Sequence, residues 1–191
     1  VLRRSARDGF KYIRSIADTD NDRIVIPYGW GAENWIGLNE FGWAHGLAGT
    51  ALSLQRLMQT GIDVEQACTM LDQVRATLAS IGLPGAPDKP FAEPSMPLDY
   101  RFGRAGVLSL LSELTLTHPQ DRKAALLRDA IVEQIISSAV RDEGIAYWEV
   151  EAPAFMGGGR QRYPGLLHGA AGIGLVLLRV RANLLGEAFS S

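Results

Sequence analysis

Two histidines and two arginines have side chains and positions suited to acid–base chemistry. His45 and His168 each stand directly before a glycine that opens an apolar segment, and Arg101 and Arg104 flank the corresponding glycine in mid-chain. Imidazole is the usual proton carrier near neutral pH, and guanidinium can hold a developing negative charge. If each glycine begins a helix, the positive helix end disfavours imidazolium, so we expect neutral rings that can accept a proton. The alternative for either histidine is a structural residue that only bonds a loop.

The segment around these residues occurs three times. Each copy reads Gly, any residue, Ala, Gly and continues into apolar residues, and the second glycines are Gly49, Gly106 and Gly172. Glycine costs roughly 1 kcal/mol relative to alanine inside a helix, so a repeated pair needs a reason. Glycines spaced i, i+3 share one helix face, where another backbone can approach closely. We therefore expect three inner helices, at about 46–59, 103–116 and 169–184, around a common centre.

Amphipathic segments alternate with these glycine-rich ones. Apolar residues recur at helical spacing over 2–17, 63–81 and 120–140, whereas 83–98 holds five of the nine prolines and must be a loop. Residues 144–151 are expected to form a short strand or β-hairpin. This order predicts an all-α fold that is part of an α/α toroid (α/α barrel), with three helix pairs and long loops. Three pairs cannot close a ring, so we expect upstream sequence or another chain to complete it.

The composition narrows the functional classes. Hydrophobic residues make up 47% and charged residues 21%, which is typical of a globular domain. The net charge of −2 and the scattered lysines and arginines give no indication of nucleic-acid binding, and no apolar run is long enough for a membrane span. The single cysteine, Cys68, fits a reducing cytoplasm and lies in the apolar stripe of the 63–81 helix, so we expect it to be buried. The chain begins without methionine and is interpreted as part of a longer protein.

Two segments resemble the lanthionine synthetase C-like cyclases. They are residues 42–49, Gly-Trp-Ala-His-Gly-Leu-Ala-Gly, and residues 164–174, Pro-Gly-Leu-Leu-His-Gly-Ala-Ala-Gly-Ile-Gly, and the ending Leu177-Leu178-Arg179-Val180 strengthens the likeness. The resemblance covers nearly the whole chain, 1–191, as the C-terminal portion of one such domain. It implies a cyclase that closes thioether rings in lanthipeptide biosynthesis by adding peptide cysteine thiols to dehydroalanine or dehydrobutyrine.

The resemblance also bears on metal binding. Zinc-dependent members of the family bind the metal through Trp-Cys-x-Gly and Cys-His-Gly segments. Here Ala44 replaces the first cysteine, and Arg101 and Phe102 replace the Cys-His pair if the second copy is that segment. If the third copy is that segment instead, Leu167 replaces its cysteine and Arg101 the other one, so only His168 remains. Neither register retains a thiolate set, so we expect no zinc and no other cofactor, as in the cyclase domains of class III kinase–cyclase synthetases.

The same resemblance suggests roles for individual residues and partners. The expected catalytic residues are His45, His168, Arg101 and Arg104, and the expected substrate-binding residues are Trp35, Trp43, Asp99 and Tyr100. His45 is the strongest candidate for the acid or base. The expected partners are a precursor peptide and either the kinase and lyase domains of the same polypeptide or the missing half of the barrel. No nucleic acid or membrane is expected, and the expected location is the cytoplasm.

Two other functions remain open from the sequence. The first is a catalytically degenerate scaffold that holds a peptide for kinase or lyase domains, which the loss of the cysteine ligands favours. The second is a glycoside-type α/α toroid enzyme with paired carboxylates, for which Glu149 and Glu151 on one strand face and Asp99 are the candidates. The same glutamate spacing is equally typical of a solvated edge strand.

Overall fold

The computed structural model describes residues 2–20, 23–26, 46–80, 98, 100, 103–151 and 158–186. Within these ranges the chain is mostly helical, with six helices and three short antiparallel ribbons. The helices are α1 (Leu2–Ile16), α2 (Leu47–Gln59), α3 (Val64–Ser80), α4 (Arg104–Thr117), α5 (Arg122–Ser137) and α6 (Ala170–Leu185). The ribbons are β1–β2 (Asp18–Asp20, Arg23–Val25), β3–β4 (Val140–Asp142, Ile145–Tyr147) and β5–β6 (Glu149–Glu151, Arg160–Arg162).

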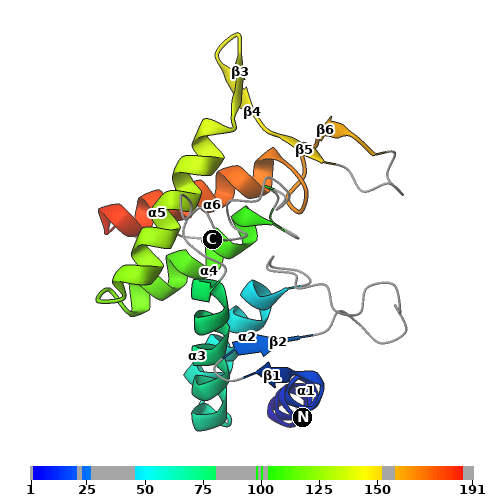
Figure 1. The fold of residues 1–191 in the computed structure, drawn as a ribbon, viewed down its shortest axis with the longest axis vertical. Coiled ribbons are helices and arrows are strands. Elements are labelled where there is room, and N and C mark those ends of the chain that lie inside the picture. Colours follow the sequence, from blue (N-terminus) through cyan, green and yellow to red (C-terminus); the bar gives the residue numbers. More distant parts are fainter. Residues whose placement is uncertain are drawn as a thin grey trace.

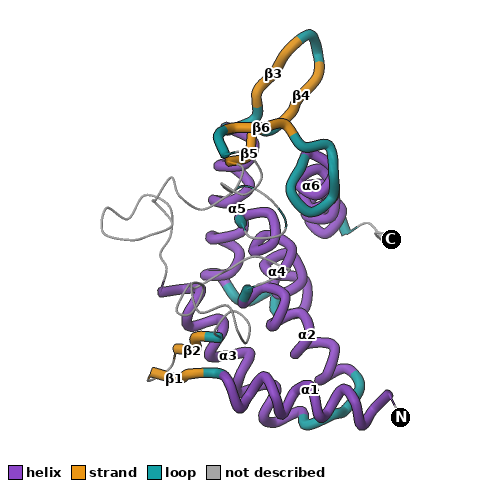
Figure 2. Tube along the Cα trace, turned by 90° about the vertical axis from the view of Figure 1, so that its right-hand side faces the viewer, coloured by secondary structure: helices purple, strands orange, loops and turns teal. Residues whose placement is uncertain are grey.

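The glycine-rich helices pack against one another, and the amphipathic helices lie beside them. Helix α4 contacts both α2 and α6, while α3 packs on α2 and α5 packs on α4 (Figure 1). Each of these outer helices follows its inner partner through a short turn, so the tight hairpins are α2–α3 and α4–α5. In both ribbon and tube views, α1 and the β3–β4 hairpin lie at opposite ends of the molecule (Figure 2).

The inner helices carry most of the core. Along α4, from Ala105 to Ser112, every residue is buried, and the second glycine Gly106 is among them. Gly172 on α6 is also buried, and Gly49 on α2 is half-buried. The expectation that the glycine-rich helices pack together is therefore confirmed for the residues that the structure describes, and α6 keeps one side exposed. A complete toroid would need more helix pairs than the structure contains.

The outer helix α3 is turned relative to the expected stripe. Its buried positions are Ala67, Met70, Leu71, Val74 and Thr77. The prediction that Cys68 is buried was wrong, because its thiol lies on the exposed side of this helix. Thr77 faces inwards because its hydroxyl accepts a 2.8 Å hydrogen bond from the backbone amide of Ile24 on β2. This contact ties the β1–β2 ribbon, which the sequence does not predict, to α3.

Helix α5 ends earlier than the periodicity indicated. It stops at Ser137, and Val140 already lies in a strand. Ser138 is the C-cap of the helix, and the β3–β4 hairpin that follows turns at Glu143 and Gly144, which both have positive φ (45° and 82°), as in the turns that match strand twist. The expected single strand over 144–151 is divided between β4 and β5.

No helix within the described ranges combines the length and apolar composition that crossing a bilayer requires.

Candidate site at the helix N-termini

The three inner helices begin in the same way. Gly46, Gly103 and Gly169 each precede a helix with φ/ψ of −134°/−172°, −121°/−157° and −137°/−168°. This is extended backbone that any residue adopts, so the torsion angles do not explain the glycines. The shared geometry shows that the three copies are equivalent in structure as well as in sequence.

A loop folds back over the start of α4 and of α6 in the same register. The Ala105 amide donates to the carbonyl oxygen of Leu98 (3.2 Å), and the Ala171 amide donates to that of Pro164 (3.3 Å). In each case the acceptor lies five residues before the first glycine of the copy and the donor two residues after it. The amide of Ala170 is also occupied, by the carbonyl of Tyr163 (2.8 Å). The equivalent sequence position before α2 is Phe41, which lies outside the described residues.

This loop explains why the third copy uses glycines. A Cβ on Gly169 would lie 1.9 Å from the carbonyl oxygen of Tyr163, and a Cβ on Gly172 would lie 1.9 Å from that of Leu166. Both distances are far below any real contact. The expected close backbone approach is confirmed here, and the approaching backbone is the chain's own preceding loop. Tyr100 lies on the same side, with its Cβ 3.0 Å from the position of a Cβ on Gly172.

His168 lies in the turn that leads into α6. It is half-buried, and its ring centroid is 6.3 Å from that of Tyr163, with the ring planes tilted by 56°. The Tyr163 hydroxyl donates a 2.8 Å hydrogen bond to the Gln161 side chain, which links this turn to β6. The neighbouring side chains of Leu166 and Leu167 are 49% and 39% exposed, so apolar surface adjoins the imidazole.

Arg104 and Tyr100 lie at the start of α4. Arg104 is the first residue of that helix and is half-buried, and this burial lowers the pKa of its guanidinium from the usual value. A poorly solvated cation interacts more strongly with a nearby developing anion than one in bulk water. The Tyr100 hydroxyl lies 3.5 Å from the hydroxyl of Ser109, one helical turn further along α4. Tyr100 therefore contacts both α4 and the first turn of α6.

Sequence reasoning missed a polar seam between α4 and α6. Arg179 donates to the buried hydroxyl of Ser109 (3.4 Å), and Asn183 donates to both the hydroxyl (2.6 Å) and the carbonyl (3.2 Å) of Ser112. The paired residues are 70 and 71 positions apart in the two contacts, which is the pattern of parallel helices. The N-termini of α4 and α6 therefore lie at the same end. The signal was present in the sequence, because Ser109 and Ser112 at i, i+3 stand among the apolar residues of 105–112.

The structure thus places three of the expected site residues. His168, Arg104 and Tyr100 all lie at the N-terminal ends of α4 and α6. The other five are outside the described residues: His45, Arg101, Trp35, Trp43 and Asp99.

The carboxylates considered for a glycosidase are placed differently. Glu149 and Glu151 lie on β5 opposite Arg162 and Arg160 of β6, and the Glu149 carboxylate is 3.6 Å from the Arg162 guanidinium. Arg162 also stacks 3.8 Å over the Tyr147 ring. This is the arrangement of a charged surface ribbon. Among the residues that the structure places, no three His, Cys, Asp or Glu side chains are grouped for metal binding.

Comparison with known proteins finds no matching family model, no matching curated protein and no matching solved structure.

Proposed function

We propose that the chain is the C-terminal portion of a zinc-free lanthionine cyclase-like domain. The substrate is a peptide with cysteines and dehydrated serine or threonine residues, and the product is a thioether ring. The observation that carries the proposal is the repeated helix N-terminus. In it, a glycine pair receives a folded-back loop, and His168, Arg104 and Tyr100 gather at the same end of α4 and α6.

The reaction needs one proton removed and one proton delivered. The thiol of a peptide cysteine has a pKa near 8.5, so a base must take its proton before sulfur can attack. Sulfur then bonds to the β-carbon of the dehydrated residue, the carbon–carbon double bond becomes an enolate, and a proton returns to the α-carbon. All atoms are conserved. We assign proton transfer to His45 and His168, and the stabilisation of the enolate to Arg101 and Arg104.

The folded-back loop restricts which groups can stabilise the enolate. The amides of Ala170 and Ala171 are taken by the loop carbonyls of Tyr163 and Pro164. These two amides are therefore closed to a substrate anion, and the role falls to side chains. Arg104 fits because it is the first residue of α4 and is only partly solvated. Trp35, Trp43, Asp99 and Tyr100 are proposed to hold the peptide, with the exposed leucines at 166 and 167 as an apolar rim.

The donor set does not fit a zinc-dependent mechanism. The positions that carry metal ligands in zinc-dependent cyclases hold Ala44, Arg101, Phe102 and Leu167 here, and none of these side chains is a usual zinc ligand. The proposal therefore assigns thiol activation to a base and involves no cofactor.

The finer architecture is also part of the proposal. We infer that the helices belong to an α/α toroid in which α2, α4 and α6 are consecutive inner helices. Support comes from exposed leucines on α6, Leu175 (37%) and Leu178 (56%), which lie on a helix whose other side is part of the core. They provide a surface for a further inner helix, supplied by the rest of the polypeptide or by another chain.

The proposal is tested by ring closure in the complete enzyme with a pre-dehydrated peptide, followed by alkylation of the remaining thiols. Replacing His45 or His168 with alanine should slow cyclisation by roughly 10²–10⁴-fold, the usual contribution of a general acid or base. His118→Ala is the matched control, because this third histidine lies after the C-terminal end of α4, where its Nδ1 is 2.9 Å from the Thr117 hydroxyl.

Thermal melts of the same variants separate the outcomes. Unchanged cyclisation in both His45→Ala and His168→Ala would remove the histidines from the mechanism. Loss of both activity and the melting transition would make them structural, and the peptide-binding scaffold would then be the better function.

A further inference from the structure

Helix α1 carries a concentrated positive charge that the rest of the chain lacks. Its 15 residues hold five basic side chains and one acidic one, Asp8, so the helix carries +4. The whole chain carries −2, and the remainder therefore carries −6. The expectation that lysines and arginines are scattered was wrong for this helix.

Four of the basic residues share one side of α1. Arg4, Arg7, Lys11 and Arg14 follow one another at spacings of three, four and three residues, which places them in a single row along a helix. We call this row the basic face. All four are exposed, with Arg4 and Arg7 side chains at 90% and 53%. Spacing alone would have revealed the row in the sequence.

The side of α1 next to the basic face packs against the rest of the chain, and the Arg14 guanidinium lies 5.9 Å from the centroid of the Phe10 ring. Phe10 is 2% exposed and belongs to the core, and Ile13 packs against it. Arg3 donates to the Thr60 carbonyl (2.9 Å), and Arg7 lies 3.4 Å from the Asp63 carboxylate in the turn between α2 and α3. These contacts hold α1 against the turn between α2 and α3, and they include Arg7 of the basic face itself, whose side chain stays 53% exposed. The pair of Arg4 and Asp8 (3.8 Å) is highly exposed and therefore weak.

We propose that the basic face binds a short acidic segment of a peptide. From Arg4 to Arg14 the row spans about 15 Å along the helix axis. An extended peptide of about five residues has the same length, and carboxylates on alternate residues lie about 7 Å apart on one side. The long arginine and lysine side chains reach that spacing.

Other polyanions fit this surface less well. Phe10 is buried, so the helix has no free apolar side to enter a bilayer. A nucleic acid or an anionic membrane extends well beyond 15 Å and would meet the negative charge of the remaining chain, whereas nucleic-acid-binding domains are usually basic overall. A short acidic segment contacts only the basic face.

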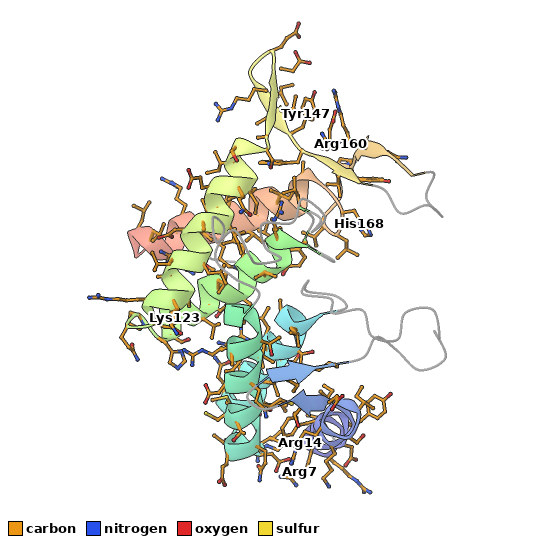
Figure 3. The ribbon with its side chains drawn as sticks, in the orientation of Figure 1. Arg7, Arg14, Lys123, Tyr147, Arg160 and His168 are labelled. Carbon is orange, nitrogen blue, oxygen red and sulfur yellow. The ribbon has the colours of Figure 1, made fainter. Side chains whose placement is uncertain are left out.

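The basic face is separate from the proposed chemistry. Arg7 and Arg14 lie at the end of the molecule opposite the β3–β4 hairpin and away from His168 (Figure 3). The inference rests on the proposed function in one respect, because it takes the acidic partner to be the same peptide that the enzyme modifies. An acidic segment bound here would hold that peptide to the enzyme while a different part of it reaches the site at the helix N-termini.

The test measures binding first. A short fluorescent peptide with glutamate at every second position is titrated with the complete protein, and the same peptide with glutamine is the ligand control. Arg4→Glu with Lys11→Glu should weaken binding of the glutamate peptide by about tenfold or more, and added salt should weaken binding to the unaltered protein. Lys123→Glu with Arg141→Glu is the matched control, because it changes the net charge equally at two exposed residues away from α1. Arg141 lies on β3, at the other end of the molecule, and Lys123 lies on α5 (Figure 3).

Each outcome decides the proposal. Equal weakening by the two variant pairs, or equal binding of the glutamine peptide, would overturn it. Tighter binding of duplex RNA or of anionic phospholipid vesicles, lost in the Arg4→Glu, Lys11→Glu protein, would also overturn it by identifying another partner class. Cyclisation of a pre-dehydrated peptide without acidic residues should be unaffected by these changes. An enzyme that lacks cyclase activity but still binds the glutamate peptide at α1 would refute the proposed function alone.

Discussion

At the residue scale, two glycines of α6 differ sharply in their surroundings. A Cβ on Gly172 would lie 1.9 Å from the carbonyl oxygen of Leu166, whereas a Cβ on Gly174 would meet nothing within 4 Å. Gly172→Ala should therefore destabilise the protein by about 1–3 kcal/mol or more, because a backbone segment must move. Gly174→Ala should stabilise it by up to about 1 kcal/mol, because alanine favours the helix.

Chemical denaturation of both variants measures the two free energies of unfolding. The pair is well matched, since both sites lie in the same helix two residues apart. Equal changes in both variants would mean that the folded-back loop does not hold Gly172 in this contact.

Asp121 should make the stability of the protein depend on pH. It caps α5 by accepting from the Ala124 amide (3.1 Å) and forms an ion pair with Arg75 of α3. Burial alone raises the pKa of this carboxyl, but the hydrogen bond from Ala124 and the Arg75 guanidinium together lower it below the usual value. The stabilisation is therefore complete above the unfolded pKa of about 4, and it is lost as the pH falls through the lower folded value.

Asp121→Asn separates the cap from the charge. Asparagine also caps helices well, so at neutral pH Asp121→Asn should lose the ion pair but keep most of the cap. Asp121→Ala loses the cap as well, and its free energy of unfolding should be lower by a further amount of about 0.5–2 kcal/mol. The stability difference between the unaltered protein and Asp121→Asn should shrink as the pH falls below about 4. Asp129→Asn, which removes an exposed carboxylate from the same helix, is the control. A difference that stays constant with pH would contradict this account.

At the element scale, the sequence predicted the six helices closely. The expected inner helix at about 103–116 is Arg104–Thr117, and the expected outer helix at 63–81 is Val64–Ser80. The boundaries were predictable because local chemistry sets them. Glycine precedes each inner helix, and Asp121 supplies a side-chain cap for α5.

Elements that depend on tertiary contacts were less predictable. The β3–β4 hairpin depends on positive φ at Glu143 and Gly144, and its base is held by Trp148, whose indole donates to the Ile135 carbonyl (2.7 Å). The rotation of α3 that exposes Cys68 depends on Thr77 and Ile24, which are 53 residues apart. Helical periodicity carries no information about such partners.

The candidate site shows the same division. The repeated glycine pair points to His168 and Arg104 beside it, the family resemblance adds Tyr100, and the structure places all three at one end of α4 and α6. Arg179 belongs to the ending that resembles the family, but its contact with Ser109 crosses 70 residues, so the sequence does not predict that contact. The close approach of Leu166 to Gly172 was foreseen as a backbone contact, but its source in the preceding loop was not.

At the scale of the whole molecule, the repeat allows one helix face to be compared with another. Counted from the second glycine of each copy, Ser109 and Ser112 are three and six residues along α4, and they receive Arg179 and Asn183 of α6. The same positions on α6 are Leu175 and Leu178, which are exposed. The face of α4 that contacts α6, the next inner helix, therefore corresponds to a face of α6 that is exposed to solvent.

This equivalence leads to a test of the toroid in the full-length protein. If another inner helix packs on α6, Leu178→Arg should bury an unpaired charge and destabilise the protein by several kcal/mol. Leu126→Arg on outer helix α5 is the matched control, because Leu126 and Leu178 are 58% and 56% exposed in this chain, and a substitution at a true surface position changes stability by about 0.5 kcal/mol or less. Thermal melts and sedimentation of both variants measure the difference. Equally small effects would show that Leu178 remains in solvent and that α6 ends the row of inner helices, which would exclude a closed ring through this face.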